Sequence, residues 1–127
     1  MIQNSMRELK FRVWCKGTST NANFNKPRWI LPTDFILLKY YRCFQDVIES
    51  DDFVVQQYTG LKDLKGIEIY EGDIISGKFY DTEYHHVETI KHEVVFNNGE
   101  YNIASNNWHK PSLKIIGNIF DNPELLK

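Results

Sequence analysis

The dipeptide Asn98-Gly99 constrains the fold of this chain more than any other pair of residues. Asn-Gly as a two-residue loop is the strongest short-range signal for a β-hairpin, because both positions of the favoured turn need a positive φ angle. It predicts a hairpin between residues 87–97 and residues 100–104. The register that the loop dictates pairs Asn97 with Glu100, Phe96 with Tyr101 and Val94 with Ile103. The last four side chains are apolar and would share one face, so turn and apolar pattern agree.

A second strand signal lies near the start of the chain, where residues 7–15 read RELKFRVWC. Apolar and polar side chains alternate there with a period of two, which is typical of a strand with one buried face. The apolar face would hold Leu9, Phe11, Val13 and Cys15, and the opposite face Lys10, Arg12 and Trp14.

The stretch QYTGLKDLKGIEIYEGDII, residues 57–75, predicts a strand, a turn closed by Gly66, a second strand, a bend at Gly72 and a third strand. Four isoleucines would supply apolar contacts around the bend: Ile67, Ile69, Ile74 and Ile75. Four carboxylates in the stretch would form an acidic ion site if they converged: Asp63, Glu68, Glu71 and Asp73. Their spacing matches no twelve-residue calcium loop. We therefore expect them to face solvent and the stretch to be structural.

Residues 16–27 are polar and predict a loop, whose far end Trp29 would help to anchor. Residues 35–48 follow helical spacing, although two short strands would also fit. Residues 113–120 predict a further strand, and Asn122-Pro123 predicts a short helical turn. The fold class is therefore mainly β, with one helix in 35–48 as an option, arranged as a small barrel or as two small packed sheets.

Charge is distributed unevenly along the chain. The whole protein has a net charge of −2 at pH 7, but residues 1–44 carry eight basic and two acidic side chains, a net charge of +6, and the rest carry −8. Such a split indicates either a nucleic-acid-binding face on the first part or two parts that neutralise each other.

The outer face of the first strand is the best candidate for contact with a partner. It combines cations with an aromatic ring: Lys10, Arg12, Trp14 and Lys16. Small β-barrels bind single-stranded nucleic acid by stacking bases on aromatic side chains along a basic groove. The alternative is that Trp14 is buried and that Lys10 and Arg12 pair with carboxylates.

No spacing in the sequence matches a catalytic or metal-binding motif. Adjacent His85 and His86 would point to opposite sides of an extended segment, which is poor geometry for a shared ion. Cys15 and Cys43 form no CxxC pair, so we expect two reduced thiols packed as small apolar groups. We predict that the protein is not an enzyme and has no catalytic, cofactor-binding or metal residues and no cofactor.

Apolar residues make up 42% of the 127 residues, which is enough for a hydrophobic core and argues against disorder. No apolar run approaches the roughly 20 residues that span a bilayer. The first residues lack the apolar block of a secretory signal. We therefore expect a cytoplasmic protein without membrane contact.

Three blocks occur in order along the chain: MRELKFRVW, QYTGLKDLKGIEIYEGDII and IIGNIFDNPELL. Together they resemble the YopX family of small phage and prophage proteins. The resemblance implies a single domain over residues 1–127, with an N-terminal β lobe over about 1–58. The C-terminal lobe, over about 59–127, would be similar to an SH3-like small barrel. The resemblance implies no catalytic or binding residues.

The function that we expect is that of a non-enzymatic phage or prophage accessory protein in the cytoplasm of its bacterial host. Such a β-rich module would bind a host or phage macromolecule, with an unknown protein partner favoured over nucleic acid because the chain is acidic overall. One alternative is a nucleic-acid-binding small barrel that uses Lys10, Arg12 and Trp14. Another is a homo-oligomeric structural protein without a ligand, whose strand edges pair between chains.

Overall fold

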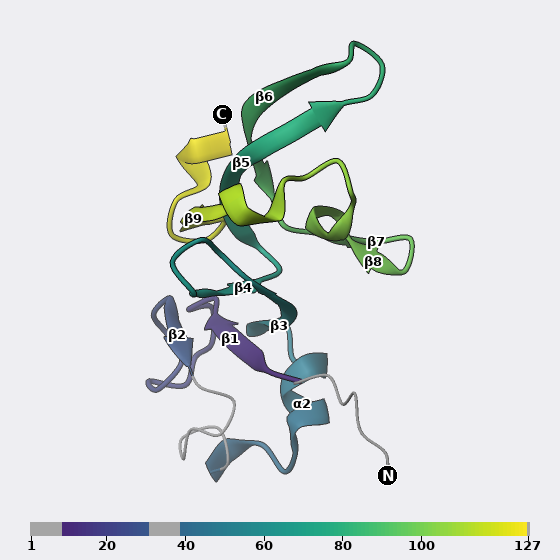
Figure 1. The fold of residues 1–127 in the computed structure, drawn as a ribbon. Helices are drawn as coiled ribbons and strands as arrows, with labels where there is room; N and C mark the ends of the chain where they lie inside the picture. Colours follow the sequence, from purple (N-terminus) through teal and green to yellow (C-terminus); the bar gives the residue numbers. More distant parts are fainter. Residues whose placement is uncertain (1–8, 31–38, 127) are drawn as a thin grey trace, which may run out of the picture. The chain divides into compact units, whose positions relative to one another are not determined.

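The structure, a computed structural model, describes residues 9–30 and 39–126 of the 127. The chain is mainly β and its sheets are antiparallel and curled (Figure 1). It divides after residue 57 into two compact units. We call residues 9–57 the first unit and residues 58–126 the second unit. Among the described residues, no helix has the length and apolar character that crossing a membrane requires.

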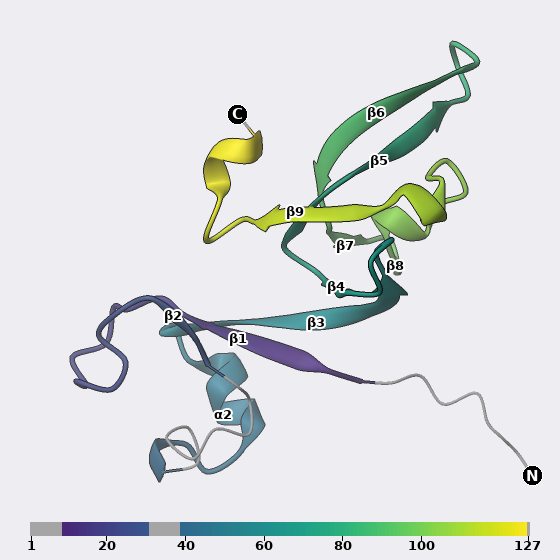
Figure 2. The ribbon, with the colours of Figure 1, turned by 60° about the vertical axis from the view of Figure 1, so that its left-hand side comes forward.

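The first unit is built on β1 (Phe11–Cys15), which pairs antiparallel with β2 (Arg28–Ile30) on one side and with the start of β3 (Phe53–Lys62) on the other. The helix α2 (Phe44–Glu49) covers one face of the β1–β3 pair (Figure 2). The alternation expected along β1 is confirmed for Val13 and Cys15, which are buried, and is wrong for Leu9, which is 64% exposed. The core of this unit contains Val13, Cys15, Phe24, Ile30, Phe53 and, from α2, Val47.

A helix is present in the segment for which helix and strands were both considered. It begins at Phe44 and ends at Glu49, and Val47 is its buried residue. Residues 31–38, which include the start of the expected helix, lie outside the described residues. Residues 16–27, between β1 and β2, contain no strand, as their polar composition predicts.

The second unit contains a three-stranded sheet with the order β6-β5-β9. Its central strand is β5 (Asp73–Asp81), flanked by β6 (His86–Glu93) and β9 (Lys114–Asn118) (Figure 2). The long hairpin of β5 and β6 pairs continuously from Ile74 opposite Glu93 to Asp81 opposite His86. The core of this unit contains Ile69, Ile75, Val94, Ile103, Trp108 and Leu113.

Shorter elements complete the second unit. β4 (Glu68–Tyr70) pairs with the second half of β3, and β7 (Phe96–Asn97) pairs with β8 (Glu100–Tyr101). Three 3₁₀ turns follow along the chain: Asn102–Ala104, Lys110–Ser112 and Pro123–Leu126. The last of these is the turn that Asn122-Pro123 predicts.

The register expected from Asn98-Gly99 is confirmed for the two pairs next to the turn, but the expected pairing of Val94 with Ile103 is not formed, and residues 86–93 pair with β5 instead of with residues 100–104. Asn98 and Gly99 have positive φ angles, +54° and +84°, and Phe96 lies opposite Tyr101 with ring centroids 5.0 Å apart. The ladder ends after two pairs, because the Asn102 side chain accepts a hydrogen bond from the Val95 N–H at 3.1 Å. The four apolar side chains therefore do not share one buried face: Val94 and Ile103 are buried, whereas Phe96 is 56% exposed.

The stretch of residues 57–75 folds in the predicted order of strand, turn, strand, bend and strand. Gly66 has a φ of +81°, the left-handed conformation that closes the turn. Three of the four isoleucines are buried, but Ile67 is 52% exposed, so the expectation for this residue is wrong. Ile67 instead contributes its backbone, whose carbonyl accepts a hydrogen bond from the Asp63 N–H at 2.8 Å.

Candidate functional site

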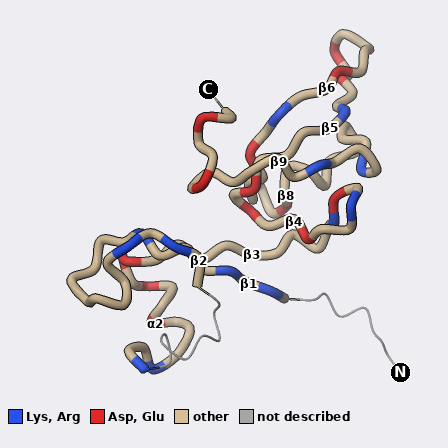
Figure 3. Tube along the Cα trace, turned by 90° about the vertical axis from the view of Figure 1, so that its left-hand side faces the viewer, with Lys and Arg blue, Asp and Glu red and all other residues tan. Residues whose placement is uncertain are grey.

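The outer face of β1 presents the predicted partner surface, with Lys10, Arg12 and Trp14 partly buried and Lys16 exposed. Figure 3 shows basic residues along β1. The Arg12 Nε donates a hydrogen bond to the Gln56 Oε1 at 2.9 Å, and the guanidinium lies 4.5 Å from the centre of the Trp29 ring. Trp14 meets Trp29 edge-on, with ring centroids 5.0 Å apart.

These contacts limit what the β1 face can stack against. One face of the Trp29 ring is covered by Arg12, which gains a cation–π interaction there. A nucleobase needs an open aromatic face, so Trp29 offers less stacking surface than its residue type indicates. The sequence did not predict Trp29 for this surface. Its strand has three residues, too few for a periodic pattern, and the pairing of Trp14 with Trp29 sets its place.

Charge is less segregated between the two units than the sequence split at residue 44 indicates. Residues 9–57 carry seven basic and five acidic side chains, a net charge of +2, and the remaining residues carry −4. The acidic side chains of residues 45–57 reduce the basic excess. A net charge of +2 gives only weak electrostatic attraction to phosphate groups. This attraction dominates the affinity of proteins for nucleic acid.

Two of the four carboxylates expected to face solvent are buried, so that expectation is wrong for Asp63 and Asp73. The Asp63 Oδ1 accepts hydrogen bonds from the N–H groups of Lys65 at 2.9 Å and Ile67 at 3.0 Å. Its Oδ2 accepts one from the Ile115 N–H at 3.2 Å. Burial raises the pKa of Asp63, but these three backbone bonds outweigh it and hold the pKa below its ordinary value.

Asp73 likewise accepts hydrogen bonds through both carboxylate oxygens, at the bend before β5. Its Oδ2 accepts a hydrogen bond from the Tyr70 N–H at 2.8 Å, and its Oδ1 accepts one from the Asn118 Nδ2 at 3.3 Å. Asp63 and Asp73 therefore organise backbone rather than gather into an ion site. The acidic stretch acts as scaffold.

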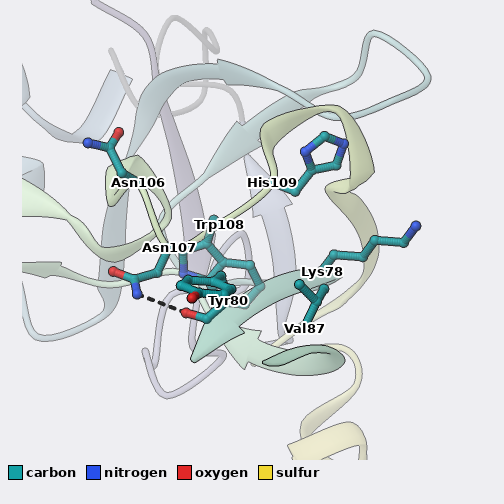
Figure 4. A pocket seen from close by; sticks show the side chains of 7 residues that line it. All are labelled: Lys78, Tyr80, Val87, Asn106, Asn107, Trp108 and His109. Carbon is teal, nitrogen blue, oxygen red and sulfur yellow. Dashed lines mark hydrogen bonds between the residues drawn. The ribbon is translucent and has the colours of Figure 1, made fainter. Parts of the chain in front are cut away.

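The second unit has an open pocket of about 430 Å³ beside the β5–β6 hairpin (Figure 4). The hairpin supplies Lys78, Tyr80 and Val87, and the segment before β9 supplies Asn106, Asn107, Trp108 and His109. Tyr80 and Val87 lie directly opposite each other on the two strands. Trp108 is 5% exposed and packs against Phe79 with ring centroids 5.1 Å apart.

Backbone hydrogen bonds fix the segment before β9 to the part of the β5 edge that β9 does not reach. The Tyr80 N–H donates to the Asn107 carbonyl at 2.7 Å, and the His109 N–H donates to the Lys78 carbonyl at 2.9 Å. The Asn107 Nδ2 donates to the Tyr80 carbonyl at 2.8 Å, the bond drawn in Figure 4. The pocket therefore has a rigid frame. The sequence did not predict it, because its two halves are about twenty residues apart and neither carries a motif.

The two cysteines are unpaired, as expected. Cys15 is buried and its thiol lies 3.5 Å from the Phe24 carbonyl oxygen, which fits a small apolar group in a core. Cys43 is exposed, so the expectation that it packs in a core is wrong. It precedes α2 with an extended backbone, φ −157° and ψ 170°.

Comparisons with known proteins identify a family and a fold. The model of the family described as YopX protein matches residues 10–127. The crystal structure of protein EF1440 from Enterococcus faecalis is similar, with a TM-score of 0.53 and 22% sequence identity over 96% of this chain and 100% of that chain. At this identity the likeness shows the fold alone. Among curated proteins, none matches the sequence.

Proposed function

The chain belongs to the YopX protein family, and from this premise we propose that it is a non-enzymatic phage or prophage accessory protein that binds a protein partner. The pocket beside the β5–β6 hairpin is the contact site in this proposal. We also retain the hypothesis that the C-terminal lobe resembles an SH3-like small barrel. Small barrels bind many unrelated partners.

The observation that carries the proposal is exposed apolar surface at the pocket. Tyr80 and Val87 are 40% and 59% exposed there, whereas Trp108, which also lines the pocket, is almost fully buried against Phe79. Aromatic side chains in preformed pockets are the usual energetic centres of protein interfaces. The hydrogen-bonded frame keeps the ordering cost of binding low, which favours affinity.

The chemistry of the rim indicates what the partner presents. The Lys78 ammonium group lies beside the apolar surface, and Asn106 adds an amide group. A partner segment with one aromatic or branched aliphatic side chain and a nearby carboxylate would match both features.

A protein partner is favoured over nucleic acid for two reasons. One lysine at the rim provides few phosphate contacts, and the net charge of −2 opposes a polyanion. Lys10, Arg12, Trp14 and Lys16 remain the surface for the nucleic-acid alternative.

Affinity capture tests the proposal when it is run with three proteins in parallel. The baits are the wild-type chain, the double variant Tyr80→Ala/Val87→Ser and the control Leu64→Ser, and the lysate is that of the bacterium that encodes the chain. Leu64 is 53% exposed and lies outside the pocket, so its substitution removes a similar exposed aliphatic group elsewhere.

We expect a protein that wild type and Leu64→Ser retain after nuclease treatment and that the double variant loses. Capture that depends on intact nucleic acid would favour the nucleic-acid alternative. Capture that is equal for all three baits would exclude the pocket as the contact site. Recovery of a second copy of this chain alone would favour the oligomeric alternative.

A further inference from the structure

The far end of the β5–β6 hairpin carries three side chains with metal-ligand chemistry on one face. Asp81 is the last residue of β5 and lies directly opposite His86, the first residue of β6. Glu88 follows His86 by two positions, so both side chains project from the same face of the strand. Within the part of the chain that the structure describes, this is the group of three whose ligand atoms lie within 4.8 Å of one another.

The three side chains lie on the opposite face of the hairpin from the pocket. Tyr80 and Val87 form the neighbouring cross-strand pair, and successive residues of a strand alternate between faces. The neighbouring His85 does not belong to this group of three, because its backbone conformation differs. Its φ of +55° is left-handed, and its Nδ1 lies 3.3 Å from the Tyr80 hydroxyl group. The group therefore includes His86 and excludes its neighbour.

The distances are close to those that a small cation requires. The His86 Nε2 lies 3.6 Å from the nearer Glu88 oxygen. Two ligands bound tetrahedrally at about 2.0–2.1 Å from zinc are roughly 3.4 Å apart. A ligand oxygen of the half-buried Asp81 lies within 4.8 Å of the ligand atoms of His86 and Glu88. The Asp81 Oδ1 accepts hydrogen bonds from the N–H groups of Glu83 at 2.8 Å and Tyr84 at 3.1 Å, which limits its movement.

We propose that Asp81, His86 and Glu88 form a surface site for a divalent transition-metal ion, with Zn²⁺ as the best match. One imidazole and two carboxylates suit zinc, whereas magnesium and calcium prefer oxygen ligands alone. Three protein ligands leave a fourth zinc position for water or for a donor from another molecule. The ion would join the ends of β5 and β6 and stiffen the tip of the hairpin.

Calorimetric titration of the full chain with ZnCl₂ tests this site, with MgCl₂ as the comparison cation. The test variants are His86→Ala and Glu88→Gln, both on exposed side chains at the hairpin end. The controls are His85→Asn, which tolerates the left-handed backbone, and Cys43→Ser, which removes the exposed thiol as a competing ligand.

We expect one Zn²⁺ per chain in wild type and in both controls, and no heat from Mg²⁺. Each test variant should weaken zinc binding by about tenfold or more. Zinc should also raise the thermal unfolding midpoint of wild type but not of His86→Ala, because only the folded chain presents the site. In NMR spectra the His86 imidazole signals should shift on zinc addition, and those of His85 and His92 should not.

Three results would overturn the site. One is wild type without zinc binding. The second is His86→Ala with wild-type affinity. The third is a loss of binding in Cys43→Ser or His85→Asn that equals the loss in His86→Ala. In the first case the contact between His86 and Glu88 is a surface contact that binds no metal ion.

Discussion

Asp73 and Asn118, 45 positions apart in the sequence, form a buried hydrogen bond in which the Asn118 amide donates to the Asp73 carboxylate at 3.3 Å. The other carboxylate oxygen accepts the Tyr70 N–H. One side chain thus fixes both the bend before β5 and the end of β9, which lies opposite it in the sheet.

We predict that Asp73→Ala lowers the free energy of unfolding by about 1–3 kcal/mol, because it leaves buried donors without an acceptor. Urea denaturation measures this change. Glu124→Ala removes an exposed carboxylate and should change stability by less than about 0.5 kcal/mol. Equal effects of the two substitutions would contradict the structural role of Asp73.

The lowered pKa of Asp63 predicts an acid-dependent loss of stability. Because the folded pKa lies below the unfolded value, about 3.9 for an ordinary Asp, the stabilisation is complete above that value and is lost as the pH falls through the folded pKa. Wild type should therefore lose more stability between about pH 5 and pH 2 than Asp63→Asn, which cannot titrate there. Urea denaturation across this range measures both slopes. Parallel slopes would show that the backbone bonds to Asp63 do not favour its charged form.

We predict that Gly→Ala lowers stability at both Gly17 and Gly60, and more at Gly17. Both have left-handed backbones, φ +79° and +87°, so alanine at either position should cost about 1–2 kcal/mol. A Cβ at Gly17 would lie 2.6 Å from the backbone nitrogen of Pro27, whereas a Cβ at Gly60 would have no neighbour within 4 Å. Gly17→Ala should therefore be the more destabilising change in a denaturation experiment, and the reverse order would contradict the close approach of Pro27.

The modest charge of the first unit predicts weak affinity for nucleic acid. Labelled single-stranded DNA, duplex DNA and RNA should show no mobility shift at low salt with about 10–50 µM protein, a range that reaches weak non-specific binding. A shift that weakens with salt and is lost in Lys16→Glu would instead support the β1 face as a nucleic-acid surface. Lys114→Glu, an equal change of charge on exposed β9, is the control.

Local chemistry explains what could be predicted from the sequence. The Asn98-Gly99 turn fixes the pairing of Phe96 with Tyr101 through φ angles that few other dipeptides adopt. The alternation along β1 likewise places Val13 and Cys15 in a core, because the period of a strand decides which side chains share a face.

The remainder depends on contacts between distant residues. The burial of Asp63 depends on the Ile115 N–H, 52 positions away, so the sequence around Asp63 contains no sign of it. The pocket arises because the segment around Trp108 pairs with the edge of β5 next to Phe79. Trp29 joins the β1 face through a strand too short to show a period. Such features follow from tertiary pairing, which single-sequence patterns do not encode.

Because Cys43 is exposed and Cys15 is buried, the chain has one accessible thiol for labelling. A maleimide dye or spin label would react at Cys43, whose side chain is exposed, and spare Cys15, which the core of the first unit encloses. The natural sequence thus yields a singly labelled protein without any substitution. The label would sit beside α2 and leave unaltered the side chains that line the pocket and those of Asp81, His86 and Glu88.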